Sequence, residues 1–256
     1  MSKVWKRKHT CEGVMMSKIE VGTSNFKMFV DAIGCFCREG DVRFEQSRLR
    51  FVGVDAAGVA LTECEIPAKL VDGEEERVGL DFNKLQQVAK KSQGDNIILD
   101  HYEGLVKIKV DRTTYKLQTI FLPSKDQPIP TIPSTVHIKM LPSDLASGIL
   151  AVTDMADTKD ANAGVWFLWN DGKFVLRDKA ELNVEVEYAQ DEYDGNIVEG
   201  IARVLISKMY AEPVAGILKK YDVCRVSVGT EMPLVVIMKK DECKCGFVIA
   251  PRIEVE

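Results

Sequence analysis

Hydrophobic residues recur along this chain in two alternating periods, a helical one and a strand-like one. Phe26, Phe29, Val30, Ile33 and Phe36 follow the three-to-four-residue spacing of one helix face. Runs such as RLRFVGV and GVALTECEI come next, rich in the residues that strands favour. Residues 24–65 are therefore predicted to form a helix followed by hairpins.

The same order of patterns returns in a second unit that starts at Asp81. The segment DFNKLQQVAKKSQGD places Phe82 and Leu85 on one face, and Gly94 is predicted to end this helix. NIILDHYEGLVKIKV then reads as a hairpin. A fixed order of elements that repeats indicates a symmetric scaffold rather than a single catalytic pocket.

Two more units follow in the second half of the chain. PSDLASGILAVTDMAD predicts a helix, and GVWFLWNDGKFVLRD a hairpin with its turn at Asn170-Asp171-Gly172. EPVAGILKKYD predicts the fourth helix, ahead of VCRVSVGTEMPLVVIMKK. Because proline lacks an N–H group, Pro213 is expected in the first turn of that helix.

A proline-rich bridge separates the two halves. Residues 122–134, LPSKDQPIPTIPS, hold four prolines in 13 residues and should run extended over the surface. The bridge is either a plain linker or a semi-rigid strip that presents Ile129 and Ile132 to a docking groove. The pattern predicts an α+β fold of two similar helix-plus-antiparallel-sheet domains. We expect a basic, disordered extension over residues 1–18, domains at 19–121 and 137–256, and a connecting loop at 122–136.

Composition narrows the class of protein further. The chain has 256 residues, 46% of them hydrophobic, and a net charge of −5. It contains no apolar run of the roughly 20 residues that span a bilayer, and its basic start lacks the apolar stretch of a secretion signal. Seven cysteines without a disulfide-like framework favour a reducing, intracellular compartment.

Catalytic patterns are missing from the sequence. It contains no phosphate-binding glycine motif and no nucleophile elbow, and its three histidines lack triad partners. The pairs Cys35/Cys37 and Cys243/Cys245 do not have the usual zinc spacing, so we expect no metal and no cofactor. Asp154, Asp157 and Asp160 leave open a metal-dependent nucleic-acid enzyme, although a solvated loop fits them better.

Positive residues gather on the polar faces of the predicted helices, although the chain is acidic overall. Such faces are usually only solvated, but three of four repeated helices carry them at comparable places. A basic lining in an acidic protein suits DNA that is enclosed. The candidate DNA contacts are Lys27, Arg38, Lys84, Lys90, Lys91, Lys219 and Lys220.

In several segments the sequence resembles the DNA polymerase sliding clamps of the proliferating cell nuclear antigen (PCNA) type, and their archaeal branch in particular. These segments are TSNFKMFVDAIG, VGVDAAGVALTECEIPA, VGLDFNKLQQVAKKSQGD, QPIPTIP, MPLVV and FVIAPRIEVE. They occur in the family's order and cover nearly all of residues 19–256.

The resemblance implies a non-enzymatic ring of three chains, with sheets outside and helices around a hole for duplex DNA. Such clamps tether polymerases, ligases and nucleases, and a clamp loader opens and closes them. The protein would then be cytoplasmic and nucleoid-associated, or nuclear in a eukaryote. A homotrimer is expected, and the alternative is a specialised subunit of a hetero-trimeric ring.

The resemblance also implies two kinds of contact surface. Partner peptides would dock between the bridge and the second domain, and the ring would close where residues 110–118 meet residues 181–188 of a neighbour. The docking residues are Val54, Gln127, Pro128, Ile129, Pro130, Pro233, Val248 and Ala250. The subunit-interface residues are Val110, Tyr115, Leu117, Leu182, Val184 and Val186.

Two departures from the family pattern stand out. The third helix usually offers basic residues to the hole, whereas its outward positions here are Ser147, Leu150 or Ala151, and Asp154. Gln127 occupies a docking position that is usually apolar. The first departure puts the DNA contact of that helix in doubt, and the second predicts weaker peptide docking.

Overall fold

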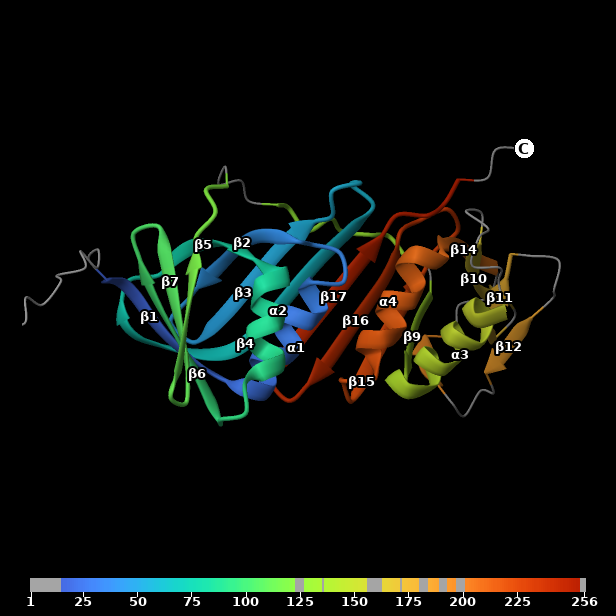
Figure 1. Cartoon of the computed structure of the whole chain (residues 1–256). Coiled ribbons are helices and arrows are strands. Elements are labelled where there is room, and N and C mark those ends of the chain that lie inside the picture. The colour runs from blue at the N-terminus through green and yellow to red at the C-terminus, as the bar shows by residue number, and fades with distance from the viewer. Residues whose placement is uncertain are drawn as a thin grey trace, which may run out of the picture.

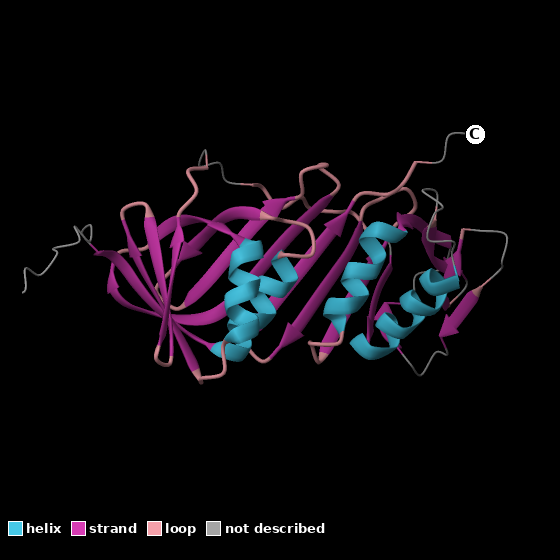
Figure 2. Ribbon diagram, viewed as in Figure 1, coloured by secondary structure: helices cyan, strands magenta, loops and turns pink. Residues whose placement is uncertain are grey.

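The helices of the described residues, four in number, lie side by side on one face of a broad layer of strands (Figure 1; Figure 2). The computed structural model describes residues 15–122, 127–134, 136–155, 163–170, 172–179, 184–188, 193–196 and 201–253. The helices are α1 (Thr23–Ile33), α2 (Phe82–Lys91), α3 (Pro142–Met155) and α4 (Lys208–Leu218).

The strands divide between the two halves of the chain. Those of the first half are β1 (Met15–Gly22), β2 (Glu39–Phe44), β3 (Arg48–Val54), β4 (Ala60–Gly73), β5 (Glu76–Asp81), β6 (Asn96–Tyr102), β7 (Leu105–Val110) and β8 (Thr113–Gln118). Those of the second half are β9 (Val136–Met140), β10 (Gly164–Asn170), β11 (Lys173–Asp178), β12 (Glu185–Tyr188), β13 (Tyr193–Asn196), β14 (Ile201–Ser207), β15 (Val223–Val228), β16 (Leu234–Lys240) and β17 (Cys243–Ile249).

Both halves use one connectivity, which confirms the predicted α+β class. In the first half β1 lies between β4 and β6, the strands β6, β7 and β8 form a meander, and β2 lies between β3 and β5. In the second half β9 lies between β13 and β15, the strands β15, β16 and β17 form the meander, and β10 lies between β11 and β14. Strands β12 and β13 together therefore take the place of the long β4.

The halves join through backbone pairing of β4 with β17. The two strands are antiparallel, with Cys245 opposite Cys64 and Phe247 opposite Thr62. This pairing makes one sheet run from β8 at one end to β13 at the other. By connectivity β17 corresponds to β8, so the first half ends in the same kind of strand without a partner beyond it.

The core lies between the helices and this sheet. Phe26, Phe29 and Ile33 of α1 are buried, as are Phe82 and Leu85 of α2. Burial of apolar surface at helical spacing is what fixes these faces against the strands. Locally, α2 starts where the Asp81 side chain accepts a hydrogen bond from the Lys84 backbone N–H at 3.1 Å.

Helix α1 ends at Ile33, earlier than the spacing of its apolar residues predicts. The Gly34 N–H still bonds to the Val30 carbonyl at 2.9 Å, and the chain then turns. Phe36 leaves the helix axis and packs against Tyr210 and Phe247 of the second half, with ring centroids 5.4 and 5.2 Å away. Phe36 is apolar because it packs between the two halves of the chain, and not because α1 extends to it.

Three other boundaries differ from the sequence predictions. Helix α2 ends at Lys91, before Gly94; its C-cap residue is Ser92, whose hydroxyl donates back to the Val88 carbonyl at 2.9 Å. Strand β1 begins at Met15, inside the expected disordered extension, because Ser17 and Ile19 are fully buried in the sheet. Helix α4 begins at Lys208, which places Pro213 in its interior.

Within the part of the chain that the structure describes, no helix is long and apolar enough to cross a membrane.

Candidate functional site

The exposed face of the helices carries most of the predicted basic residues. Lys84, Lys90 and Lys91 are exposed on α2, opposite its buried stripe. Lys219 is the exposed C-cap residue of α4, and Lys220 follows it. Arg38 is exposed too, but it lies in the loop after α1 and not on that helix as predicted, because α1 ends at Ile33.

Three of these cations are already bound to other groups. The Lys27 ammonium donates to the Ser92 carbonyl at 2.7 Å and so closes the C-terminal end of α2. Lys220 pairs with Asp31 of α1 at 2.5 Å, and Lys84 pairs with Asp81 at 3.1 Å. Among the described residues Arg38, Lys90, Lys91 and Lys219 make no ion pair, so their charge is available to a ligand.

Helix α3 presents a neutral to acidic face, as the sequence indicated. Ser147, Ala151 and Asp154 are exposed, whereas Leu150 is half-buried against the core. At its C-terminal end the Lys208 ammonium donates to the Thr153 carbonyl at 2.6 Å. The basic surface therefore belongs to α2 and to the C-terminal end of α4.

Five strands have a single partner among the described residues and so form sheet edges: β5, β8, β12, β13 and β14. Two of them, β8 and β12, belong to the predicted interface segments. Strand β8 is bonded to β7 alone, and β12 to β11 alone. Tyr115 and Leu117 of β8 are half-buried against the core, as are Val184 and, on β12, Val186. The Tyr188 hydroxyl fixes β12 to α3 by donating to the Asp144 carbonyl at 3.1 Å.

One predicted interface residue is wrong. Val110 lies on β7, between β6 and β8, and only 4% of it is exposed. The edge strand is therefore β8, which does not include Val110. The sequence prediction included Val110 because polar and apolar residues alternate in β7 as they do in β8. Leu182 lies outside the described residues.

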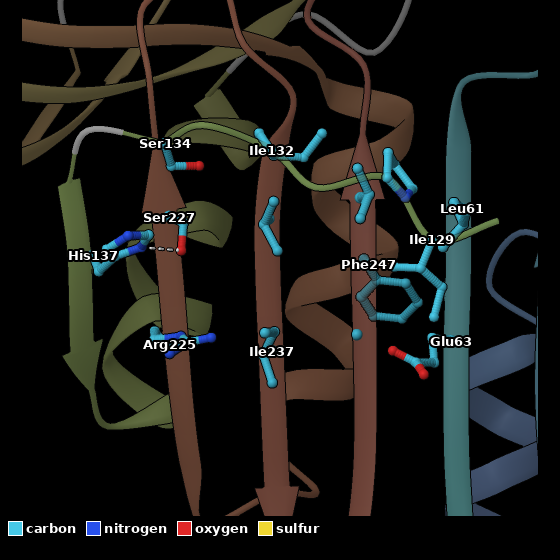
Figure 3. Close-up of a pocket in the computed structure, with 14 residues that line it drawn as sticks. Leu61, Glu63, Ile129, Ile132, Ser134, His137, Arg225, Ser227, Ile237 and Phe247 are labelled. Carbon is cyan, nitrogen blue, oxygen red and sulfur yellow. Dashed lines mark hydrogen bonds between the residues drawn. The ribbon is translucent and has the colours of Figure 1, made fainter.

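Residues 127–134 cross the sheet on the face away from the helices and cover a groove of about 200 Å³ (Figure 3). Ile129, Pro130 and Ile132 form its upper wall. Leu61, Val235, Ile237 and Val248 contribute to its floor. The floor residues come from β4, β16 and β17, so the groove spans the joint between the halves.

The remaining predicted docking residues lie elsewhere. Val54 and Gln127 line a second, larger groove of about 1220 Å³, together with Met209 and Tyr210. Pro128, Pro233 and Ala250 line neither groove; the Ala250 N–H donates to the Val59 carbonyl at 2.9 Å. The structure therefore brings only Ile129, Pro130 and Val248 of the predicted docking residues together in the first groove.

Sequence reasoning missed several residues of the first groove. Leu61, Val235 and Ile237 occupy alternate outward positions of their strands, so period-two alternation could have found them. His137, Arg225 and Ser227 come from β9 and β15. Nothing local in the sequence places these polar residues under the bridge, because only the sheet order brings β9, β15 and β16 together.

The cysteines are free thiols within the described chain, and no group of three or more His, Cys, Asp or Glu there could hold a metal ion. Burial raises the pKa of Cys35 to about 12 and that of Cys37 to about 11. Asp154 is exposed near the end of α3, and Asp157 and Asp160 lie outside the described residues.

Comparisons with known proteins agree on one class. No protein-family model matches the chain. A DNA polymerase sliding clamp of Methanococcus maripaludis is 22% identical over 257 residues, covering 93% of this chain and all of the relative. The PCNA of A. fulgidus, bound to the C-terminal region of FEN-1, superimposes with a TM-score of 0.83 at 23% identity, over 94% of this chain and 100% of that one. A PCNA2–PCNA3 complex of Sulfolobus tokodaii gives a TM-score of 0.77 at 19% identity, over 93% and 100%.

The chain therefore has the DNA clamp fold, with helices on one face of paired sheets. In sequence it is similar, over 93% of its length, to archaeal DNA polymerase sliding clamps, and in structure to PCNA chains.

Proposed function

We propose that this chain is a processivity clamp, a ring of three copies that encloses duplex DNA and tethers polymerases, nucleases and other replication and repair proteins to it. The observation that carries the proposal is the internal β4–β17 joint. In this joint β17, the last strand of a meander, pairs with β4 of the other half. Strand β8 corresponds to β17 and strand β12 to the paired part of β4, and neither has such a partner among the described residues. An exposed strand edge is a template for pairing with another chain, and head-to-tail pairing that closes forms a ring.

The register of the joint between chains follows from the register inside the chain. The β7–β8 and β16–β17 hairpins both turn at an aspartate of positive φ, Asp111 and Asp241, so Leu117 corresponds to Phe247. The Asp55 and Asp178 N–H groups bond to the Ala60 and Val184 carbonyls at 2.9 Å each, so Val186 corresponds to Thr62. Since Phe247 pairs with Thr62, Leu117 is predicted to pair with Val186 of the neighbouring copy.

This register has a chemical consequence. It places Tyr115 opposite Tyr188, both on the side that packs against the core. It also places Lys116 opposite Glu187, both exposed, and Glu187 would share its charge with Lys173 of its own chain, 2.7 Å away. Opposite charges directly across an antiparallel pair contribute about 0.2–1 kcal/mol. The two edges of a single chain are thus complementary to each other, which supports a homotrimer.

Charge exchange tests the register. Lys116→Glu and Glu187→Lys should each weaken the trimer, because each places like charges opposite one another, and the double variant should restore it. Tyr115→Pro or Val186→Pro should dissociate the ring, because proline removes a ladder donor and blocks close approach. Sedimentation at micromolar concentration measures the oligomeric state of the charge and proline variants. If the proline variants stay trimeric, the interface lies elsewhere.

DNA contacts should go to phosphates, because a sliding protein must not stop at any sequence. Lys90, Lys91 and Lys219 have free charges on the helix face, and Arg38 has one at its rim, whereas Lys27, Lys84 and Lys220 would first have to leave their partners. Alanine at the three free lysines should reduce processive synthesis and flatten its salt dependence. Lys239→Ala is the matched control, because Lys239 is exposed on the opposite face of the sheet.

Partner peptides are proposed to dock in the groove under the bridge. The similar PCNA of A. fulgidus binds the C-terminal region of FEN-1, which supports a docking function of this kind. Ile129→Ala with Pro130→Ala should cost about 1–3 kcal/mol of peptide binding if these side chains are anchors. Calorimetry with a peptide holding a glutamine and two aromatic residues measures it, with Val71→Ala as a control at an exposed residue of β4. Equal affinity for the wild type and the double variant would place docking elsewhere.

We further propose that the chain has no catalytic activity of its own, and that it acts inside the cell, on the nucleoid or in the nucleus.

A second candidate is a specialised subunit of a hetero-trimeric ring. The face of α3, without any lysine or arginine, favours it, because two other subunits could supply the missing charge. The solution mass separates the two, since a subunit of a mixed ring need not trimerise alone.

A further inference from the structure

Two helices meet across the internal joint, the end of α1 and the start of α4. Figure 1 shows α1 and α4 in the middle of the helix row, with α2 and α3 on its outer sides. The Phe36 ring, just after α1, packs on Tyr210 of α4 with the ring centroids 5.4 Å apart. The Cys35 thiol donates to the Pro213 carbonyl of α4 at 3.7 Å. These contacts show which positions of the repeat face the joint.

The matching positions on α2 follow from backbone hydrogen bonds at the helix starts. The Phe82 N–H bonds to the Arg38 carbonyl at 2.8 Å, and the Lys208 N–H bonds to the Ala163 carbonyl at 3.1 Å. Arg38 and Ala163 each directly precede the strand, β2 or β10, that pairs with the strand leading into the helix. Phe82 therefore corresponds to Lys208. By the same count along the two helices, the counterparts of Tyr210, Pro213 and Gly216 are Lys84, Gln87 and Lys90.

The matching positions on α3 follow from its buried face. That face has one spacing in both helices, seen in Phe26, Phe29, Val30 and Ile33 of α1 and in Leu145, Gly148, Ile149 and Val152 of α3. The third residue beyond this face is Phe36 after α1 and Met155 at the end of α3, and Cys35 corresponds in the same way to Asp154.

A single chain leaves both sets of positions uncovered. Met155 is 56% exposed, unusually open for a large apolar side chain. Asp154 is exposed and forms no ion pair with a described residue. On α2, Lys84 and Gln87 are exposed too. The end of α3 thus offers an apolar side chain and a carboxylate, and the start of α2 offers donors.

We propose that the end of α3 is a docking site for the start of helix α2 of a second copy of this chain. Met155 packs there on the methylene stem of Lys84, because a lysine buries its stem while its ammonium stays polar. The Asp154 carboxylate accepts hydrogen bonds from the Lys84 ammonium or the Gln87 amide. This assignment rests on the proposed ring and names side chains that join its subunits beside the strands.

The docking accounts for the absence of lysine and arginine from α3. A cation at position 154 would face the neighbour's Lys84, and like charges repel. Lys84 therefore belongs to the joint and not to the DNA contacts. Lys90 stays a DNA candidate, because a Cβ added at its counterpart Gly216 meets nothing within 4 Å, so this position faces open space.

Sedimentation from nanomolar to micromolar concentration tests the apolar contact through the dissociation constant of the trimer. Met155→Gln should weaken each joint about tenfold or more, the effect of losing one buried methionine side chain. Met155→Leu is the matched control and should leave the constant within about threefold. Both positions of contact are exposed in one chain, so circular dichroism should show unchanged folding.

Charge exchange tests the polar contact. Asp154→Lys and Lys84→Glu should each weaken the trimer up to about fivefold, as expected for an exposed ion pair, and the double variant should restore it. Lys90→Glu makes the same change on the same helix, away from the joint, and should not weaken it. A carbodiimide, which joins a carboxylate to an amine in contact, should link Asp154 to Lys84 between chains.

The outcomes separate this contact from the ring itself. If the wild type is trimeric but Met155→Gln and Lys84→Glu leave its dissociation constant unchanged, the docking site on α3 is wrong and the ring stands. Equal weakening by Lys84→Glu and Lys90→Glu would also overturn the site, because the effect would then come from overall charge. A wild type that stays monomeric at micromolar concentration would overturn the proposed homotrimer.

Discussion

At the scale of single residues, burial decides what the thiols can do. Cys64 and Cys245 face each other across the joint of β4 and β17, and both are fully buried. Burial, with the neighbouring Cys245 thiol, raises the pKa of Cys64 well above its usual value. Since the thiolate is the reactive form, these side chains pack as small apolar groups.

Alkaline pH should therefore destabilise the fold through its cysteines. Burial and the nearby Asp55 carboxylate raise the pKa of Cys37 from 9.0 to about 11. The folded chain holds this proton more tightly than the unfolded chain, so the contribution is complete below pH 9 and is lost as pH rises toward 11. The free energy of unfolding, measured in urea from pH 8 to 11, should fall less steeply for Cys37→Ala. Parallel slopes for variant and wild type would contradict the raised pKa.

Residue patterns predicted faces better than they predicted contacts. The spacing of Phe82 and Leu85 gave the buried face of α2 correctly, because it depends on local geometry alone. The lysine pattern located Lys27 on α1 but not its bond to the Ser92 carbonyl, which joins residues 65 positions apart. Such a contact follows from the packing of α1 on α2, so no local pattern reveals it.

At the scale of elements, α4 carries an internal defect. Pro213 is the sixth residue of this helix and cannot donate to the carbonyl four residues earlier. Sequence reasoning placed it in the first turn, because interior prolines cost about 3 kcal/mol. Buried Ala211, Val214 and Leu218 offset that cost by packing on the sheet.

Pro213→Ala should consequently stabilise the chain. It restores a donor and removes a ring from the helix interior, so Tm should rise, by an amount corresponding to about 1–3 kcal/mol. Thermal melts of this variant can be compared with those of Gly216→Ala, which adds a Cβ to the same helix where nothing lies within 4 Å. A lower Tm for Pro213→Ala would mean that the ring packs better than alanine.

Strand edges show what repetition in the sequence can and cannot reveal. The repeat predicts that sheet edges are left exposed, and the family resemblance implied which segments form them, residues 110–118 and 181–188. It did not separate β7 from β8, so Val110 was placed on the edge, because alternation looks alike in both. The partner of an edge strand lies on another element, so pairing requires the fold.

At the scale of the whole molecule, side-chain bonds reinforce the joint between the halves. The Tyr210 hydroxyl of α4 donates to Asp55 in the β3–β4 loop at 2.8 Å. Burial alone would raise the pKa of Asp55, but hydrogen bonds from the Ala60 backbone and from Tyr210 hold it below its usual value. The carboxylate thereby links the two halves while it shapes its own loop.

Loss of this link should be measurable in the intact chain. Tyr210→Phe removes one hydrogen bond and should lower the free energy of unfolding by about 0.5–1.5 kcal/mol. The stability that the lowered Asp55 pKa provides is present above pH 3.8 and is lost as pH falls further, so the variant should lose less on acidification. A double-mutant cycle with Asp55→Asn gives the coupling; zero coupling would show that the bond contributes nothing.

The central claim, that one chain holds both complementary edges of a closed ring, is tested most directly by its mass in solution. Light scattering on the purified protein at micromolar concentration should give three times the chain mass of 28.6 kDa. Lys116→Glu should lower this mass, and adding Glu187→Lys should restore it. A wild type that remains at 28.6 kDa would contradict self-closure and leave the mixed ring as the better account.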